Sequence, residues 1–175
     1  MVILQPGARY WFKAWPPEQF TELADQLTSQ YGCQVLIGGS RQDGDHAQQI
    51  RQMAKSSPII MAGRTTIEQF AAIAKKSALF VGSDSGVMHI ASALGTPMVA
   101  LFGPSSLVEW GLCGGPVEVL YKGLDCRSCF HLTCTRGEEN YMRLIAVQEV
   151  CAAAQRLFLV GKSGCGAASY SSSDR

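Results

Sequence analysis

The sequence predicts an α/β domain in which helices cover both faces of a doubly wound parallel sheet. Short apolar runs alternate along the chain with segments of helical periodicity, as in proteins whose parallel strands are joined by helices. Glycine and polar residues follow four of these runs, where turns are needed. With 175 residues, of which 47% are hydrophobic, the chain is large and apolar enough for one domain with a full core.

Six apolar runs are expected to be strands because they have strand length and lie between turn signals. They cover residues 2–4, 34–37, 59–62, 79–81, 98–102 and 117–121. The run at 79–81 is too short for a helix and suits a strand that is buried on both faces. Helical segments between the runs predict parallel strands, so we expect a Rossmann-like domain.

Caps and apolar spacing predict helices in the intervals between strands. The first helix begins in residues 16–18, where two prolines precede a glutamate, and ends at Gly32. Its expected core stripe consists of Phe20, Leu23, Ala24, Leu27 and Tyr31. A capping box over residues 66–69 precedes another helix. Further helices are expected over residues 45–55, 87–94 and 147–159.

The turns after the first four strands are expected to lie along one edge of the sheet. They comprise residues 6–9, 38–39, 63–66 and 82–86. Open parallel sheets bind their ligands at the edge formed by the carboxyl ends of the strands. A glycine after any single strand is usually only turn chemistry. Four such turns, two of them flanked by basic residues, favour a nucleotide cleft.

The segment from Phe80 to His89 is the most specific of these turns. It consists of a strand, a polar turn and the start of a helix. Asp84 and Ser85 suit an N-cap, and Gly86 permits close approach of a ligand. The N–H groups at such a helix start bind anions, most often phosphate. A lone histidine in an apolar helix is more often a core residue, but the place of His89 in the first turn favours a functional role.

Two further side chains have both a functional and a purely structural interpretation. Lys13 is either a solvated loop lysine or a cation that neutralises a departing diphosphate, and its sequence position does not decide between them. The acidic pair of Asp43 and Asp45 is either a metal site or a helix cap. We favour the cap, with Asp43 still within reach of a ribose hydroxyl.

Seven cysteines, an odd number, indicate a reducing compartment rather than a disulfide framework. A loop with Cys126, Cys129 and Cys134 could hold a metal with His131 as fourth ligand, but the spacing is awkward and no metal is expected. Fifteen basic against fourteen acidic residues exclude a bulk electrostatic case for nucleic acid. No apolar run is long enough to span a bilayer and no secretory signal is present, so we expect a cytoplasmic protein.

Seven short motifs occur in an order and spacing that resemble a known family. They are Pro6-Gly7-Ala8, Lys13-x-Trp15-Pro16, Gly38-Gly39, Gly63-Arg64-Thr65, the run from Asp84 to Pro97, Leu101-Phe102-Gly103-Pro104-x-Ser106 and Trp110-Gly111. Over residues 2–158 the chain resembles the carboxyl-terminal half of glycosyltransferase family 9, the lipopolysaccharide heptosyltransferases. The resemblance implies the C-terminal domain of a GT-B fold, with a donor-binding domain at residues 1–160. Residues 161–175, which are rich in Gly and Ser, are expected to be a disordered tail.

The resemblance also implies a reaction and its partners. The donor would be ADP-heptose, used without a metal or other cofactor, and the acceptor a lipid A–Kdo core. Acceptor and general base would belong to an amino-terminal domain that this chain lacks, so the chain alone would bind donor without turnover. A location in the cytoplasm, compatible with peripheral association at the inner face of the cytoplasmic membrane, follows from that role.

The resemblance assigns a role to each donor-site residue. The set is Lys13, Asp43, Thr65, Asp84, Ser85, Gly86 and His89. Lys13 and His89 would stabilise the leaving diphosphate, which Ser85 and Gly86 would also bind. Asp84 would hold heptose hydroxyls. Thr65 would lie beside the adenine and Asp43 near the ribose.

Other function classes remain open at this point. The chain could be a non-catalytic nucleotide-sugar binding module, or a domain like a nucleotide-sugar epimerase, which would prefer UDP to ADP. A thiol-rich interaction domain is a further alternative. Many relatives have a fourth cysteine where this chain has Tyr141, which weakens a metal role for the cysteine loop.

Overall fold

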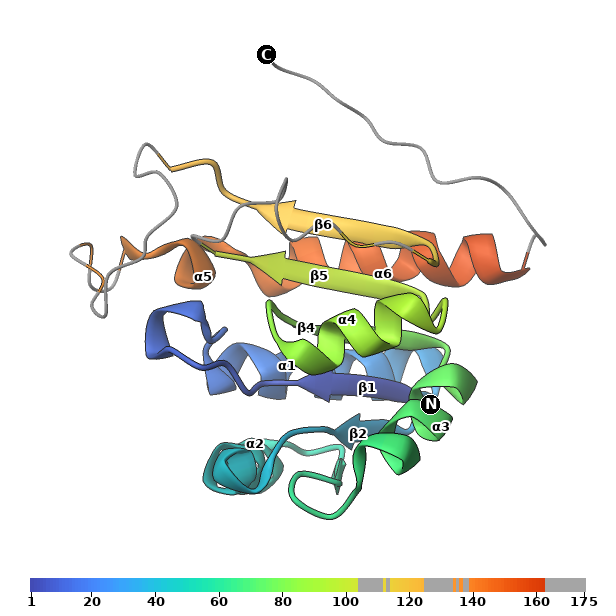
Figure 1. Ribbon diagram of the computed structural model, residues 1–175. Coiled ribbons are helices and arrows are strands. Elements are labelled where there is room, and N and C mark those ends of the chain that lie inside the picture. The colour runs from blue at the N-terminus through green and yellow to red at the C-terminus, as the bar shows by residue number, and fades with distance from the viewer. Residues whose placement is uncertain (104–111, 113, 125–133, 135, 137–138, 163–175) are drawn as a thin grey trace.

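The computed structural model describes residues 1–103, 112, 114–124, 134, 136 and 139–162. Within these residues one sheet has the strand order β3-β2-β1-β4-β5-β6, and every neighbouring pair is parallel. The strands are β1 (Val2–Gln5), β2 (Val35–Ile37), β3 (Ile59–Ile60), β4 (Leu79–Ser83), β5 (Met98–Phe102) and β6 (Val117–Tyr121). The predicted doubly wound parallel sheet is thus confirmed (Figure 1). β3 is shorter than expected.

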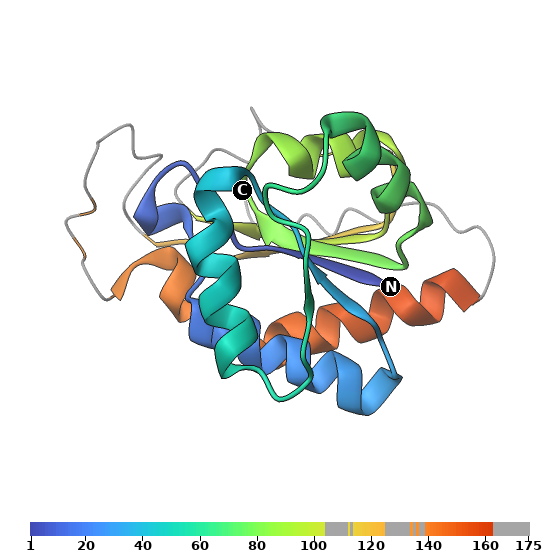
Figure 2. The same cartoon turned by 90° about the horizontal axis from the view of Figure 1, so that it is seen from below.

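Helices lie on both faces of this sheet (Figure 2). The helices are α1 (Pro17–Tyr31), α2 (Gly44–Met53), α3 (Ile67–Lys76), α4 (Gly86–Ala93), α5 (Tyr141–Leu144) and α6 (Val147–Lys162), with short 3-10 turns η1 (Trp11–Lys13) and η2 (Arg41–Asp43). α1, α2 and α6 cover one face, and α3 and α4 cover the other. The two short turns and α5 are too brief to leave a periodic pattern, and we did not predict them.

Alternate side chains of the central strands enter two separate cores, because successive residues of a strand point to opposite faces. In β4, Leu79 and Val81 pack toward α1 and α6, whereas Phe80 packs toward α3 and α4. All three are fully buried, and burial of each such side chain contributes about 1.5–3 kcal/mol. Burial on both faces explains why these strands read as continuous apolar runs.

Two of the predicted details change in the structure. Tyr31, expected in the core stripe of α1, is 38% exposed because it lies in the last turn, where its ring meets Phe158 at 5.3 Å instead of the sheet. α6 continues to Lys162, so its last two residues lie within the predicted tail of residues 161–175. Residues 163–175 lie outside the described residues.

The predicted capping box before α3 is present in the structure. At the start of α3, the Thr66 hydroxyl accepts from the N–H of Gln69 at 3.3 Å and the Gln69 side chain accepts from the N–H of Thr66 at 3.0 Å, which is the predicted capping box. Among the helices described, none is both long and apolar enough to traverse a bilayer.

Candidate functional site

Three predicted site residues from three separate elements meet at the carboxyl edge of the sheet. Lys13 Nζ lies 3.4 Å from Asp84 Oδ2, and His89 Nε2 lies 3.5 Å from Asp84 Oδ1. Lys13 ends η1, Asp84 follows β4, and His89 stands in α4. Their side chains are 22%, 13% and 34% exposed. We call these three residues the Asp84 cluster, in which two basic side chains hold the two oxygens of one largely buried carboxylate.

The loop that carries Lys13 is anchored on both sides of it. Phe12 is buried, and its ring stacks on that of Tyr10 at 5.4 Å. Trp15 is 1% exposed, and its Nε1 donates to the carbonyl of Ile145 at 3.0 Å. Because Phe12 and Trp15 are both fixed in this way, the side chain of Lys13 is directed at Asp84. The structure therefore excludes the interpretation of Lys13 as a solvated loop lysine.

The start of α4 lies next to the Asp84 cluster. Ser85 occupies the N-cap position as predicted, but its side chain makes no capping hydrogen bond. The first N–H groups of a helix have no partner within the helix, so capping by a ligand remains open here. Among the described residues, no atom would lie within 4 Å of a Cβ atom added at Gly86. The described part of the chain therefore leaves room beside Gly86, as a ligand contact requires.

Three polar atoms near this edge are buried without a hydrogen-bond partner in the described structure. They are Gln5 Oε1, Ser83 Oγ and Ser85 Oγ. Gln5 and Ser83, at the ends of β1 and β4, are only 3% and 0% exposed. An unsatisfied buried polar group costs about 1–3 kcal/mol, so such groups gather where something else supplies their partners. Sequence reasoning missed Gln5 and Ser83; the available signal was a polar residue closing an otherwise apolar buried strand.

Asp43 lies along the same edge, beside the ends of β1 and β2. Its Oδ2 accepts from the N–H of Ser40 at 2.6 Å and from the Ser40 hydroxyl at 2.8 Å. Asp43 occupies the predicted N-cap position of α2, but its side chain makes no capping bond there. It belongs instead to the capping box of η2, whose N-cap is Ser40. A Cβ atom on Gly7 would lie 2.5 Å from the Asp43 carboxylate, so only glycine leaves room for that carboxylate there. The position of the Asp43 side chain therefore depends on the absence of a side chain at residue 7.

Thr65 is not brought into the Asp84 cluster. It follows β3, which is separated from β4 by β2 and β1. Three strand spacings correspond to about 14 Å. An elongated ligand such as an extended nucleoside diphosphate could span that distance, with its two ends near Thr65 and the Asp84 cluster and its middle near Asp43. The predicted site residues are therefore strung along one edge rather than gathered in one cavity.

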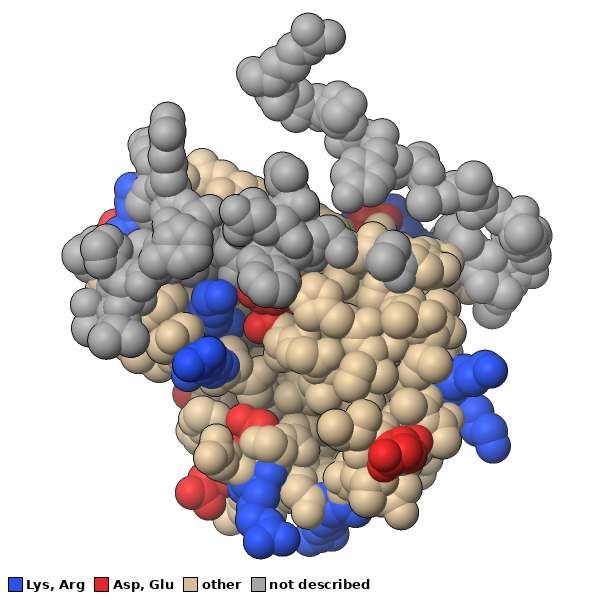
Figure 3. Space-filling view, viewed as in Figure 1, with Lys and Arg blue, Asp and Glu red and all other residues tan. Residues whose placement is uncertain are grey.

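No strong charge surrounds the site on the face seen in Figure 3, where acidic and basic side chains are interspersed with much uncharged surface. This agrees with the net charge of +1. Within the described residues, no group of three or more His, Cys, Asp or Glu side chains is arranged to hold a metal ion. Cys126, Cys129 and His131 of the predicted loop lie outside the described residues.

The cysteines in the described part of the chain are free thiols. Cys33, Cys134 and Cys151 form no disulfide. Burial raises the pKa of the Cys151 thiol to about 11, and the nearby Glu22 carboxylate adds to the shift. Burial likewise raises the pKa of Cys33. These two thiols are therefore protonated near neutral pH and poorly suited to nucleophilic chemistry.

Comparison with known proteins connects this geometry to a family. The sequence matches the family described as "Glycosyltransferase family 9 (heptosyltransferase)" over residues 1–140. Lipopolysaccharide heptosyltransferase 3 of Escherichia coli K12 is 31% identical over 163 residues, which cover 89% of this chain and 46% of that protein. The chain thus spans about half the length of the curated relatives it matches.

Solved structures give the same result. The E. coli ADP-heptose LPS heptosyltransferase II is 28% identical and aligns with a TM-score of 0.79, over 91% of this chain and 46% of that one. A glycosyl transferase family 9 protein from Veillonella parvula DSM 2008 is 27% identical with a TM-score of 0.81, again over 91% and 46%. These likenesses confirm the resemblance that the motifs predicted.

Proposed function

Since the chain belongs to glycosyltransferase family 9, we propose that it is the carboxyl-terminal, donor-binding half of a heptosyltransferase. In this proposal the donor is ADP-heptose, a ligand that also stands in the name of the E. coli relative. The single observation that carries the proposal is the convergence of Lys13, Asp84 and His89 beside the start of α4. Unpaired buried polar atoms at the same edge support a ligand there.

The charges of the Asp84 cluster suit a sugar diphosphate better than a bare anion. Asp84 offsets the charge of Lys13, so net charge alone gives little attraction for phosphate. The attraction comes instead from N–H groups and the dipole at the start of α4, which are directional. The Asp84 carboxylate is an acceptor for sugar hydroxyls. A ligand with both a diphosphate and hydroxyl groups can bind the N–H groups of α4 through its phosphates and the Asp84 carboxylate through its hydroxyls.

The same groups fit the transition state of inverting sugar transfer. As the bond from the sugar to the diphosphate breaks, negative charge grows on the departing phosphate oxygens. Lys13, His89 and the N–H groups of α4 are held in place before reaction, so they stabilise that charge without reorganising. The Ser85 hydroxyl can donate a further hydrogen bond to the diphosphate. No step of this scheme requires a metal held by the described residues.

The rest of the reaction is assigned to a second half. The proposed acceptor is the lipopolysaccharide inner core, bound with a general base by an amino-terminal domain. This chain alone would then bind the donor but transfer no sugar. The proposed place of the reaction is the cytoplasmic side of the membrane.

Calorimetry with ADP, ADP-heptose and UDP tests the proposal. We expect ADP and ADP-heptose to bind and UDP to bind more weakly. Lys13→Ala and His89→Ala should each weaken ADP binding by about 1–2 kcal/mol, or roughly 5- to 30-fold, as expected for charge-assisted hydrogen bonds. Lys76→Ala is the matched control, because Lys76 is an exposed lysine in the last turn of α3.

The outcomes separate the alternative functions. Unchanged affinity for ADP in both variants would exclude the Asp84 cluster as the diphosphate site. Preference for UDP would favour an epimerase-like domain. Binding of ADP-heptose without turnover, even after an acceptor domain is supplied, would indicate a binding module rather than half of an enzyme.

A further inference from the structure

Gln5 is the last residue of β1, and a glycine stands beside it on each side of that strand. Its register partner on β4 is Gly82, and on the β2 side Gly38 follows Ile37, the partner of Leu4. A Cβ atom on Gly38 would lie 2.7 Å from Gln5 Oε1, and one on Gly82 would lie 2.8 Å from Gln5 Cβ. The two glycines therefore leave the space that the Gln5 side chain fills.

The side-chain amide of Gln5 is buried without a partner for its oxygen. The residue is 3% exposed, and Oε1 accepts no hydrogen bond within the described residues. A methionine has nearly the same length and would fill this space without an unsatisfied carbonyl. Buried groups of this kind are rare in folded proteins and call for a specific partner from outside the chain. Rotation about the last side-chain torsion turns the oxygen without moving the carbon atoms, because that torsion has a broad range of low energy.

The position of this oxygen indicates the chemistry of its partner. Oε1 accepts hydrogen bonds and does not donate, so it suits a hydroxyl or N–H group and not an ionised phosphate. It lies beside Gly38, toward β2, whereas the Asp84 cluster follows β4 on the other side of β1. The Asp43 carboxylate lies beside the next residue, because a Cβ atom on Gly39 would be 3.1 Å from Asp43 Oδ2. Two acceptors from different elements thus adjoin the consecutive glycines 38 and 39.

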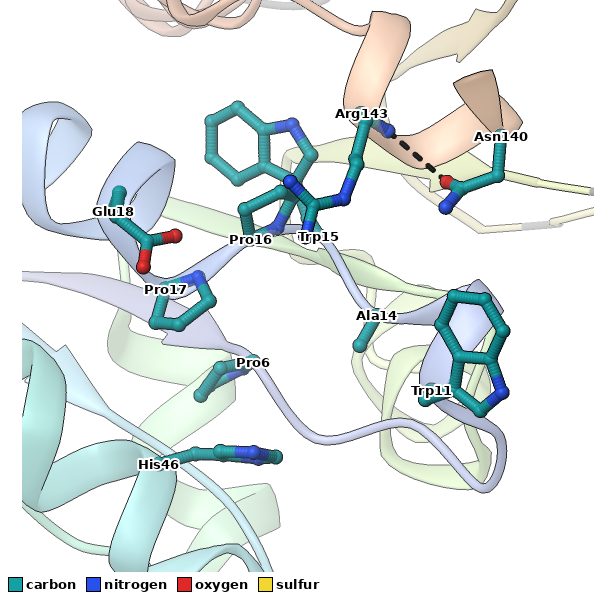
Figure 4. Close-up of a pocket in the computed structure, with 10 residues that line it drawn as sticks. All are labelled: Pro6, Trp11, Ala14, Trp15, Pro16, Pro17, Glu18, His46, Asn140 and Arg143. Carbon is teal, nitrogen blue, oxygen red and sulfur yellow. Dashed lines mark hydrogen bonds between the residues drawn. The ribbon is translucent and has the colours of Figure 1, made fainter. Parts of the chain in front are cut away.

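A cavity begins one residue beyond Gln5. Pro6 lines this cavity of about 330 Å³, which lies between the Lys13 loop, α1, α2 and α5, and His46 of α2 lies opposite Pro6 (Figure 4). The volume is at the lower end of the range usual for small-molecule sites. The carboxyl end of β1 therefore borders space that a small group of a ligand can enter.

We propose that Gln5 is a specificity-determining residue of the nucleotide site. Its carbonyl oxygen accepts a hydrogen bond from one ribose hydroxyl, and the Asp43 carboxylate accepts one from the other. Adjacent hydroxyls on one ring supply the two donors that this pair of acceptors calls for. Ribose also joins the base to the diphosphate, so it belongs between Thr65 and the Asp84 cluster, where Gln5 and Asp43 stand. The identity of the ligand as a nucleotide rests on the proposed function.

Calorimetry on the full chain with ADP, 2′-deoxy-ADP and 3′-deoxy-ADP tests this proposal. Gln5→Met removes the amide and keeps the shape of the side chain. We expect it to weaken ADP binding about fivefold, as for the loss of one hydrogen bond. It should leave unchanged the affinity for the deoxy analogue that lacks the hydroxyl bound by Gln5, and that analogue identifies the hydroxyl. Without ligand, the melting temperature of Gln5→Met should equal or exceed that of the wild type, because an unsatisfied buried oxygen is removed.

Gln19→Met is the matched control. Gln19 Oε1 is likewise buried without a partner in the described structure, but Gln19 belongs to α1, which covers the opposite face of the sheet from Gln5. The control should bind all three nucleotides as the wild type does.

Three results would overturn the role of Gln5: unchanged ADP affinity in Gln5→Met, an equal loss for ADP and both deoxy analogues, or a lower melting temperature. If ADP binding depended on Lys13 but not on Gln5, the proposed function would stand and this inference would fail. Preference for UDP over ADP, with the same dependence on Gln5 and on a ribose hydroxyl, would overturn the proposed donor and support this inference. Absence of any nucleotide binding would overturn both.

Discussion

The ion pairs beside β6 and the Asp84 cluster show two different uses of charge in one small domain. Lys122 Nζ lies 2.6 Å from Glu149 Oε2, and Arg156 meets Glu118 through two hydrogen bonds of 2.9 and 3.0 Å. Both pairs are short. In the Asp84 cluster the distances are 3.4 and 3.5 Å, and the carboxylate is only 13% exposed.

The two regions differ in whether their polar groups already have close hydrogen-bond partners within the protein. The Glu149 carboxylate also accepts from the N–H of Ala146 at 2.8 Å, so its oxygens are occupied by close partners within the protein. Asp84 meets Lys13 and His89 at longer distances, and the hydroxyls of Ser83 and Ser85, which have no partner in the described structure, adjoin it in sequence. Short pairs of this kind fix the structure, whereas hydroxyls that have no partner in the described structure can take one from a ligand. The following predictions test that distinction.

The largest effect is expected from the side chain that places Lys13. Trp15→Ala should lower the free energy of unfolding by about 3–5 kcal/mol, because it removes a fully buried indole. Trp15→Phe keeps most of the packing and loses only the bond to Ile145, so it should cost about 1 kcal/mol. Urea denaturation measures both. Equal losses in the two variants would show that the hydrogen bond, not packing, holds the loop.

Removal of the central carboxylate should separate sugar from nucleotide. We expect Asp84→Ala to weaken ADP-heptose binding by about 2 kcal/mol, since hydrogen bonds to a charged group are lost. Binding of ADP should not weaken, because ADP has no heptose and the loss of Asp84 leaves the charge of Lys13 less offset. Calorimetry with both ligands gives the comparison. If both affinities fell together, Asp84 would act through Lys13 and His89 and not through the sugar.

An unpaired hydroxyl should matter for binding and not for folding. Ser85→Ala removes an Oγ that has no partner in the described structure, so the free energy of unfolding should hardly change. ADP affinity should fall by about 1 kcal/mol, the usual contribution of one hydrogen bond. Ser29→Ala on α1 is the control, with an exposed hydroxyl bonded to its own helix. A stability loss without a binding loss would assign Ser85 to the fold.

The smallest effect on the free energy of unfolding is expected from the ion pair of Lys122 and Glu149. Hydrogen bonds from Lys122 and from the Ala146 N–H lower the pKa of Glu149 below 4.5 in the folded state. A depressed pKa stabilises the fold above the unfolded pKa, and that stabilisation is lost as pH falls through the folded value. Because the side chain is 42% exposed, the contribution should stay below about 1 kcal/mol.

Glu149→Gln measures this contribution. The difference in unfolding free energy between wild type and variant should be present near neutral pH and shrink below about pH 4. ADP binding should be the same in both proteins. A pH-independent difference would show that the carboxylate contributes through hydrogen bonds that survive its protonation.

Local patterns predicted the sheet and much of the edge, because those features depend on neighbours in sequence. The strands at 98–102 and 117–121 were predicted to the residue, since apolar runs between turns specify them. The hydrogen bonds from Ser40 to the Asp43 carboxylate span three residues and belong to turn chemistry. The orientation of Lys13 depends instead on Trp15 reaching Ile145, a contact between residues 130 positions apart. No local pattern encodes such a contact.

The same contact between Trp15 and Ile145 has a consequence for how the protein is made. During translation the opening loop leaves the ribosome long before Ile145 is synthesised, so β1 can exist while the nearby lysine is still loosely held. Completion of the cluster then waits until Ile145 has been synthesised. A chain that stops before residue 145 would contain the segments of all six strands. It would lack the hydrogen bond from Trp15 to Ile145 that holds the loop of Lys13.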